Sequence, residues 1–277
     1  MRWRSATPCS VPARIDTVTS WTFVQRSLGA RLMLGCTCPE NRLATVLVDT
    51  SEVGAWITDD LTFVLIGAWL GRTVGGRVAA FEGLGHPTDD QLKAMGAAAA
   101  STGAVGLFHV IGAMPEASTR EAAFGGKTPR EVIRLSRDAL NAVRSFLSTA
   151  SCAPGDSIDA VAIGSPHLSA DELGCLGVLL GSRRCRIPLY ACTGRYVLHQ
   201  LADSDLIQRL EALGVSIVTD TCIVVTPILP RANGILVTNS GKFAHYAPSL
   251  TGYSVVFASL RDCVESAVAG KLVAATS

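Results

Sequence analysis

Residues 158–181, IDAVAIGSPHLSADELGCLGVLLG, decide the fold of this 277-residue chain. The stretch opens with an apolar run, IDAVAIG, which is typical of a strand buried on both faces of a parallel sheet. Ser169 and Glu172 follow with the spacing of a capping box, so we expect a helix to begin there. A second apolar run, IPLYA at 187–191, predicts the next strand. A strand, a helix and a strand in this order predict a parallel βαβ unit.

The same alternation continues on both sides of this unit. Further strands are expected at 43–49, 104–110, 215–219, 234–238 and 253–258, and helices at 58–76, 87–102, 204–214, 259–270 and from Tyr196. We also expect one long amphipathic helix over 128–150, with Pro129 just inside its start. The pattern predicts an α/β fold of mostly parallel sheets covered by helices on both faces. Residues 1–42 stay unplaced, whereas 43–277 form the α/β region, with either a domain seam or an ordinary connection near 151–157.

Composition argues against several classes of function. Lys and Arg total 24 against 23 Asp and Glu, and aromatic residues make up 6%, so we expect no nucleic-acid partner. Residues 95–114 carry no formal charge, but glycines and His109 interrupt them, so we expect no membrane span. Nine scattered cysteines without a secretory segment before them indicate thiols in a reducing, cytoplasmic compartment. The pair Cys36 and Cys38 lacks the second pair that a zinc ribbon requires.

Polar clusters follow several of the expected strands directly. In open α/β sheets, ligands bind beyond the carboxyl ends of the strands, so these clusters predict a site on one edge of the sheet. They are GSPH (164–167), CTGR (192–195), TDTC (219–222), TNSGK with AHY (238–246), and His109 with Glu116. Cys222 stands where the TDTC loop enters an expected strand at 223–225. A free cysteine is most often an inert core residue, but the neighbours Asp220 and Thr221 favour a metal ligand or a nucleophile.

The TNSGK segment only partly resembles a phosphate-binding loop. It lacks the first glycine of that motif, and Phe243 stands where a Walker motif requires Ser or Thr. A phosphate-binding transferase therefore stays a minor alternative. A small anionic substrate held by Lys242 and Arg195 is better supported, because a guanidinium suits a carboxylate. We assign four further side chains to substrate binding: Asn239, Ser240, His109 and His245.

The strings GSPHLS (164–169), DTCIVVTPI (220–228), TNSGKFAHYAP (238–248) and SLRDCVESAVAGK (259–271) resemble the aconitase X family. LFHVIGAMPEA and PENRLATVLVD look like that family too, so that the resemblance covers about residues 39–271. It is closer to the bacterial hydroxyproline group than to the archaeal phosphomevalonate group. The resemblance implies an aconitase-like catalytic region. It also implies a dehydratase that removes water from a small hydroxy acid, with cis-3-hydroxy-L-proline as first candidate and an iron–sulfur cluster or iron as Lewis acid.

The resemblance also implies roles for particular residues. Cys222 is similar to a family cluster ligand, and Cys38 or Cys36 is the candidate for a second, whereas a third family ligand position holds Ser165 here. Lys242 and Arg195 would spread carbanion charge. The base would be His167, Ser165 or a serine of a small swivelling domain.

The family's chains carry further segments ahead of PENRLATVLVD. We therefore expect a shortened chain that works with a small swivelling-domain subunit. Two alternatives stay open, a noncatalytic homologue and the large subunit of a phosphomevalonate-type dehydratase.

Overall fold

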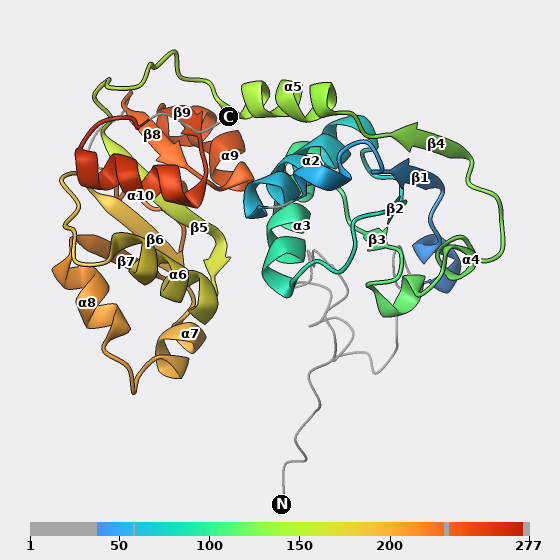
Figure 1. Cartoon of the computed structure of the whole chain (residues 1–277), viewed down its shortest axis with the longest axis horizontal. Helices are drawn as coiled ribbons and strands as arrows, with labels where there is room; N and C mark the ends of the chain where they lie inside the picture. The colour runs from blue at the N-terminus through green and yellow to red at the C-terminus, as the bar shows by residue number, and fades with distance from the viewer. Residues whose placement is uncertain (1–37, 58, 230–232, 274–277) are drawn as a thin grey trace, which may run out of the picture.

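The computed structural model describes residues 38–57, 59–229 and 233–273. Within them the strands form two parallel sheets flanked by helices (Figure 1), which confirms the predicted α/β class. The first sheet has the order β3-β2-β1-β4 and the second the order β7-β6-β5-β8-β9. The strands are β1 (Val46–Asp49), β2 (Ala79–Glu82), β3 (Phe108–Val110), β4 (Glu131–Arg134), β5 (Ala160–Leu168), β6 (Leu189–Thr193), β7 (Val215–Thr219), β8 (Ile235–Thr238) and β9 (Ser254–Phe257).

Helices follow most of the strands and carry the chain back to the start of the next one. They are α2 (Asp60–Thr73), α3 (Asp89–Gly103), α4 (Arg120–Phe124), α5 (Arg137–Leu147), α6 (Ala170–Leu180), α7 (Arg195–Gln200), α8 (Leu206–Ala212), α9 (Gly241–Thr251) and α10 (Leu260–Ala269), with short 3-10 turns η2 (Pro39–Arg42), η3 (Gly54–Trp56) and η4 (Pro115–Ala117). Figure 1 shows the first sheet with α2 to α4 on the right and the second with α6 to α10 on the left.

Helix starts agree with the capping residues in the sequence. Ser169 and Glu172 form the predicted capping box at α6, because each side chain accepts a hydrogen bond from the other residue's backbone amide. Thr88 forms a similar box at the start of α3, and Ser259 caps α10. These bonds satisfy amides that have no partner within the helix, so they place the starts of these helices.

Each face of the second sheet packs against a different core. Along β5, Ala160 and Ala162 belong to the core that α2, α3 and α9 share, whereas Val161 and Ile163 belong to the core with α6 and α10. This alternation follows from the two-residue period of a strand. Residues 151–157 lie between α5 and β5, where the chain passes from one sheet to the other, and a domain seam there stays a prediction.

Helices α2 and α3 touch through their backbones. A Cβ atom added to Gly67 would lie 2.8 Å from the carbonyl carbon of Met95 and would overlap its oxygen. Gly241, at the start of α9, lies close to both helices. A Cβ there would lie 2.7 Å from Val64 Cγ1 of α2 and 3.1 Å from Ala98 Cβ of α3. We call the first sheet with η2 to η4 and α2 to α4 the first unit, and the second sheet with α6 to α10 the second unit. The small residues therefore let α9 of the second unit approach α2 and α3 of the first.

The helix predicted over 128–150 is wrong in its first half. Residues 131–134 form β4, which pairs in parallel with β1, with Glu131 opposite Val46. Helix α5 begins only after Ser136, whose side chain accepts a hydrogen bond from the amide of Ala139 at 3.2 Å. Strand β2 was not predicted, and the AHYAP segment belongs to α9. In the part of the chain that the structure describes, no helix has the length and apolarity that crossing a bilayer requires.

Candidate functional site

The candidate site lies at the carboxyl ends of β5, β6 and β7 and at the start of α9, which we call the rim. Strand β5 continues through the GSPH segment, so Ser165 and His167 belong to the strand itself and do not follow it. Ser240, the N-cap of α9, donates a hydrogen bond from its hydroxyl to the Ser165 carbonyl and accepts one from the Phe243 amide at 3.1 Å. The structure thus brings Ser165 and Ser240 together, and both are almost fully buried.

His167 is exposed on the rim and faces the loop after β7. Its Nε2 lies 3.3 Å from the carbonyl oxygen of Thr221, which can only accept, so this nitrogen donates. A Cβ on Gly194 would lie 3.8 Å from His167 Nδ1 and 3.9 Å from Asp220 Oδ1. The imidazole and the Asp220 carboxylate therefore flank the same glycine.

Asp220 is a further candidate for the site, which the sequence analysis treated only as a neighbour of Cys222. Its Oδ1 accepts a hydrogen bond from the Arg195 amide at 2.9 Å, and its Oδ2 accepts one from Arg195 Nε. The amide and then the guanidinium of Arg195 hold the pKa of Asp220 below its usual value, and His167 acts in the same direction. Asp220 adopts a left-handed backbone, with φ of 56°. Such conformations gather at functional sites. In the sequence, the signal that could have identified Asp220 was its position directly after an expected strand.

Cys222 does not enter a strand, so the strand expected at 223–225 is wrong. The Cys222 carbonyl accepts hydrogen bonds from the amides of Val225 at 3.1 Å and Thr226 at 3.0 Å, which closes a turn. Its thiol interacts electrostatically with that of Cys192 in β6. Burial raises the pKa of Cys192 to about 11, the Ile223 amide opposes this, and Cys222 adds to it. The rim therefore holds two cysteines, of which Cys192 is fully buried and Cys222 is partly exposed.

The expected iron ligands do not form a metal site among the described residues. Cys38 is the N-cap of η2 in the first unit, and its carbonyl accepts from the Asn41 amide at 3.1 Å. Within the described ranges, no three His, Cys, Asp or Glu side chains gather where a metal could bind. Cys36 lies outside those ranges. The described donors alone therefore do not fit an iron–sulfur cluster or an iron atom, which need several soft ligands in one place.

The remaining candidates for the site divide between two places. Asn239 and Lys242 flank the start of α9 beside Ser165, and Lys242 is exposed. His245 instead lies against Phe146 of α5, with ring centroids 6.4 Å apart. Burial, and then the charge of Arg72, lowers the pKa of His245. Asn239 and Lys242 thus share the rim with Ser165, whereas His245 faces another helix.

His109 belongs to the other sheet, so the prediction of a single shared edge is wrong for this residue. It is 2% exposed, and its Nε2 lies 2.6 Å from the Arg42 carbonyl oxygen. Arg42 in turn donates to both carboxylate oxygens of Glu116. Burial lowers the pKa of His109. His109 is therefore a buried residue of the first unit, whereas the pair of Arg42 and Glu116 next to it reaches the surface, with the Glu116 side chain 43% exposed.

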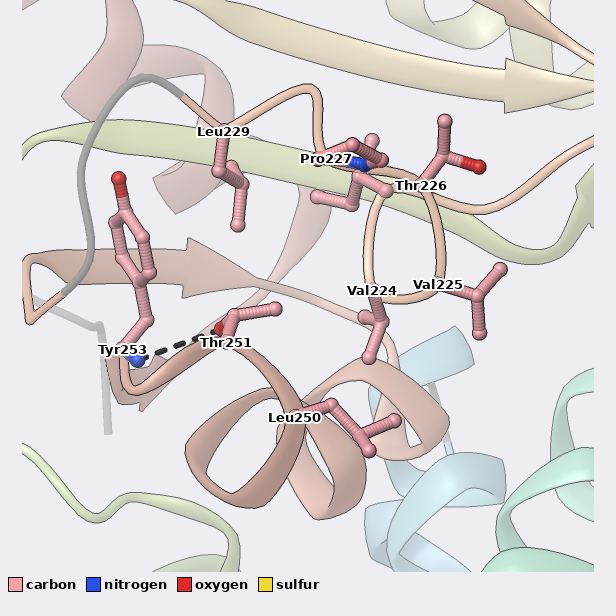
Figure 2. A pocket seen from close by; sticks show the side chains of 9 residues that line it. Val224, Val225, Thr226, Pro227, Leu229, Leu250, Thr251 and Tyr253 are labelled. Atoms are coloured by element: carbon pink, nitrogen blue, oxygen red, sulfur yellow. Dashed lines mark hydrogen bonds between the residues drawn. The ribbon is translucent and has the colours of Figure 1, made fainter.

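An uncharged groove of about 260 Å³ lies beside the turn after Cys222 (Figure 2). Val224, Thr226 and Leu229 of that turn form one wall, and Leu250 and Tyr253 form the other. None of the residues that line it carries a charge. The groove therefore differs in chemistry from the polar rim, and sequence reasoning did not anticipate it.

Comparison with known proteins shows where this chain has relatives. The family model described as "Aconitase X second domain" matches residues 44–145, and "Aconitase X third domain" matches residues 158–269. A solved structure titled as aconitase X of Thermococcus kodakaraensis in its holo-form aligns with a TM-score of 0.76 at 30% identity, covering 89% of this chain and 61% of that chain.

Three curated relatives are enzymes by name. The cis-3-hydroxy-L-proline dehydratase of Pseudomonas aeruginosa is 38% identical over 250 residues, which are 88% of this chain and 42% of that protein. The enzyme of the same name from Hypocrea jecorina is 34% identical over 83% of this chain and 39% of that protein. The phosphomevalonate dehydratase large subunit of Methanothermobacter thermautotrophicus is 33% identical over 79% of this chain and 52% of that protein. The chain thus spans about two fifths of the length of the first two relatives.

Proposed function

The chain belongs to the aconitase X family, and on this premise we propose that it forms the α/β catalytic part of a hydro-lyase that removes water from a small hydroxy acid. The first candidate substrate is cis-3-hydroxy-L-proline, because two relatives at 38% and 34% identity carry that enzyme name. Phosphomevalonate is the second, since the relative at 33% identity is named for it. A cytoplasmic location is part of the proposal, on the grounds of nine scattered cysteines.

The single observation that carries the proposal is the gathering of His167, Arg195 and Asp220 at the rim. Dehydration next to a carboxylate requires a group that takes a carbon-bound proton and cations that stabilise the charge left behind. His167 is exposed there and can exchange a proton. Arg195, held by Asp220, and Lys242 can bind the carboxylate of the substrate. Ser165 is the second candidate for the proton transfer.

The cofactor and the partner are the finer parts of the proposal. We propose Cys222 as the described thiol that would contribute to an iron–sulfur centre or iron site, with its other ligands outside the described residues. The described donors alone do not complete such a site. A small swivelling-domain subunit is the proposed partner, because five of the relatives are named large subunits.

The experiment is a dehydration assay on the chain purified without oxygen, alone and with a candidate small subunit. Mass spectrometry would follow the loss of one water from cis-3-hydroxy-L-proline, with the trans isomer as matched control substrate and phosphomevalonate as second substrate. We expect turnover of the cis isomer only. Turnover of phosphomevalonate alone would replace the substrate assignment. No turnover of any substrate with the partner present would identify a noncatalytic homologue.

A phosphate-binding role for TNSGK receives no support from its geometry. The Ser240 hydroxyl is engaged by the Ser165 carbonyl and the Phe243 amide, so it caps α9. Gly241 lies against Val64 and Ala98 and does not line an open loop. A nucleotide-dependent rise in melting temperature would be required to restore this alternative.

A further inference from the structure

Lys93 of α3 lies at the junction of the two units and takes no part in the proposed chemistry. Its Nζ donates to Glu172 Oε2 at 2.6 Å, to Asp90 Oδ1 at 2.7 Å and to the carbonyl oxygen of His167 at 3.0 Å. Asp90 belongs to the same helix, whereas Glu172 belongs to α6 and His167 to β5. One ammonium group therefore joins a helix of the first unit to the strand and helix that carry a site residue of the second.

The capping box of α6 also bonds to two side chains of α3, Lys93 and Asp90. The Ser169 hydroxyl accepts from the Glu172 amide at 3.1 Å and donates to Asp90 Oδ2 at 2.6 Å. Glu172 Oε2 accepts from the Ser169 amide at 2.8 Å as well as from Lys93. Burial raises the pKa of Glu172, and the Lys93 charge opposes this shift. The start of α6 thus depends on two side chains of α3 for its position.

Two carbonyl groups of the β5 end are held from different elements. The Ser165 carbonyl accepts from Ser240 at the start of α9, and the His167 carbonyl accepts from Lys93 on α3. Helix α3 follows β2, so its first turns lie at the carboxyl edge of the first sheet. The contact therefore links the carboxyl edge of the first sheet to the end of β5.

The ion pair of Arg183 and Glu265 neither joins the two units nor lies at the rim. Arg183 and Glu265 form a bidentate pair at 2.7 and 2.9 Å, but both residues belong to the second unit and lie away from the rim. Their side chains are 41% and 33% exposed, against 29% and 28% for Lys93 and Glu172. Solvent weakens exposed pairs, so Arg183 provides a matched control for the loss of a cation without loss of positioning.

We propose that Lys93 is a positioning residue, which fixes the backbone at His167 and with it the imidazole at the rim. The inference rests on the proposed function only where it concerns turnover. The placement of His167 can be measured without any substrate.

The test is the imidazole signal of His167 in the full chain labelled with nitrogen-15 at histidine, assigned by comparison with His167→Gln. We expect Lys93→Met to shift this signal, Arg183→Met to leave it unchanged, and Lys93→Arg to restore it in part. If Lys93→Met does not fold, Glu172→Gln replaces it. Glutamine keeps the capping box but loses the charge that holds Lys93, so we expect a smaller shift in the same signal. An unchanged signal in the folded variant, or an equal shift in Arg183→Met, overturns the proposal.

Turnover gives a second readout, once the wild-type chain and its partner show dehydration. We expect Lys93→Met to lower kcat by about ten- to hundredfold, because small misplacements of a reacting group carry penalties of that size. KM should stay within about threefold, since Lys93 does not contact the substrate. A wild-type kcat in Lys93→Met overturns the positioning role. Absence of turnover in the wild type contradicts the proposed function alone and leaves the His167 signal as the test of Lys93.

Discussion

The carboxylate of Asp220 holds Arg195 at two points, through the backbone amide at 2.9 Å and through the side-chain Nε. Asp220 follows β7, and Arg195 begins α7 just after β6. The contact therefore joins the carboxyl ends of β6 and β7, which are neighbours in the second sheet. A guanidinium oriented in this way can present its remaining donors to a carboxylate.

Asp220→Asn should weaken the hold on Arg195 while keeping the left-handed backbone, because asparagine tolerates positive φ. We expect KM for the hydroxy acid to rise by about tenfold, which corresponds to the loss of one good contact. Steady-state kinetics measure this. The melting temperature should change little, since the Arg195 side chain is 78% exposed. Glu211→Gln on α8 is a control with the same chemical change. An equal effect of both variants on KM would contradict the prediction.

Stability should fall on acidification because of His109. Burial lowers its pKa, so folding favours the neutral imidazole and the unfolded chain binds more protons below about pH 6.5. The contribution of His109 is therefore fully present above that pH and is lost as the pH falls through the lowered folded value. Urea unfolding at about pH 7 and pH 5 measures this loss. We expect a smaller loss in His109→Gln, and the wild-type loss in the control His86→Gln, where the side chain is exposed.

Gly67→Ala should destabilise the packing of α2 on α3. The added methyl group would overlap the Met95 carbonyl group, and backbone atoms cannot move aside as a flexible side chain can. Overpacking of this kind lowers the free energy of unfolding by about 1–3 kcal/mol. Denaturant titration measures the change. Gly76→Ala is the matched control, because nothing lies within 4 Å of its added Cβ. Equal stability of the two variants would be incompatible with the packing described.

Ser136→Ala should remove the cap of α5 and lower the free energy of unfolding by about 1 kcal/mol. The hydroxyl of Ser136 accepts from the Ala139 amide at 3.2 Å, and an alanine leaves that amide without this partner. Ser145→Ala, within the same helix, should have no such effect, since its hydroxyl binds only the Asn141 carbonyl. If a single helix ran through 128–150, the two substitutions would have similar effects.

Cys222→Ala should lower the iron bound after anaerobic reconstitution of the chain with its partner. Thiolates hold iron in such centres, and loss of one ligand weakens the site. Elemental analysis and the visible absorption spectrum measure the change. Cys175→Ala is the control, because this cysteine is exposed on α6. Wild-type iron content in Cys222→Ala would remove this residue from the ligand set.

Much of the fold could be derived from the sequence because the signals that specify it are local. The apolar run of β5 and the capping box of Ser169 and Glu172 lie within a few residues of each other, and the structure confirms both. The segment 131–134 shows the limit of such signals. Its spacing fits the helix that follows, and Val132 is 61% exposed, yet it pairs with β1. That pairing depends on a strand far away in the chain, which local periodicity cannot report.

The sequence by itself determined the α/β class, the starts of α3, α6 and α10, and the position of Arg195 and Ser240 just beyond strand ends, because parallel strands direct their carboxyl ends to one edge. Only the tertiary structure decided that Lys93 reaches the His167 carbonyl, 74 residues along the chain. It also decided that His109 belongs to the other sheet. The physical reason is the distance along the chain over which each interaction acts. Caps and apolar runs depend on neighbouring residues, whereas these contacts exist only after two sheets have formed and α9 has packed against α2 and α3.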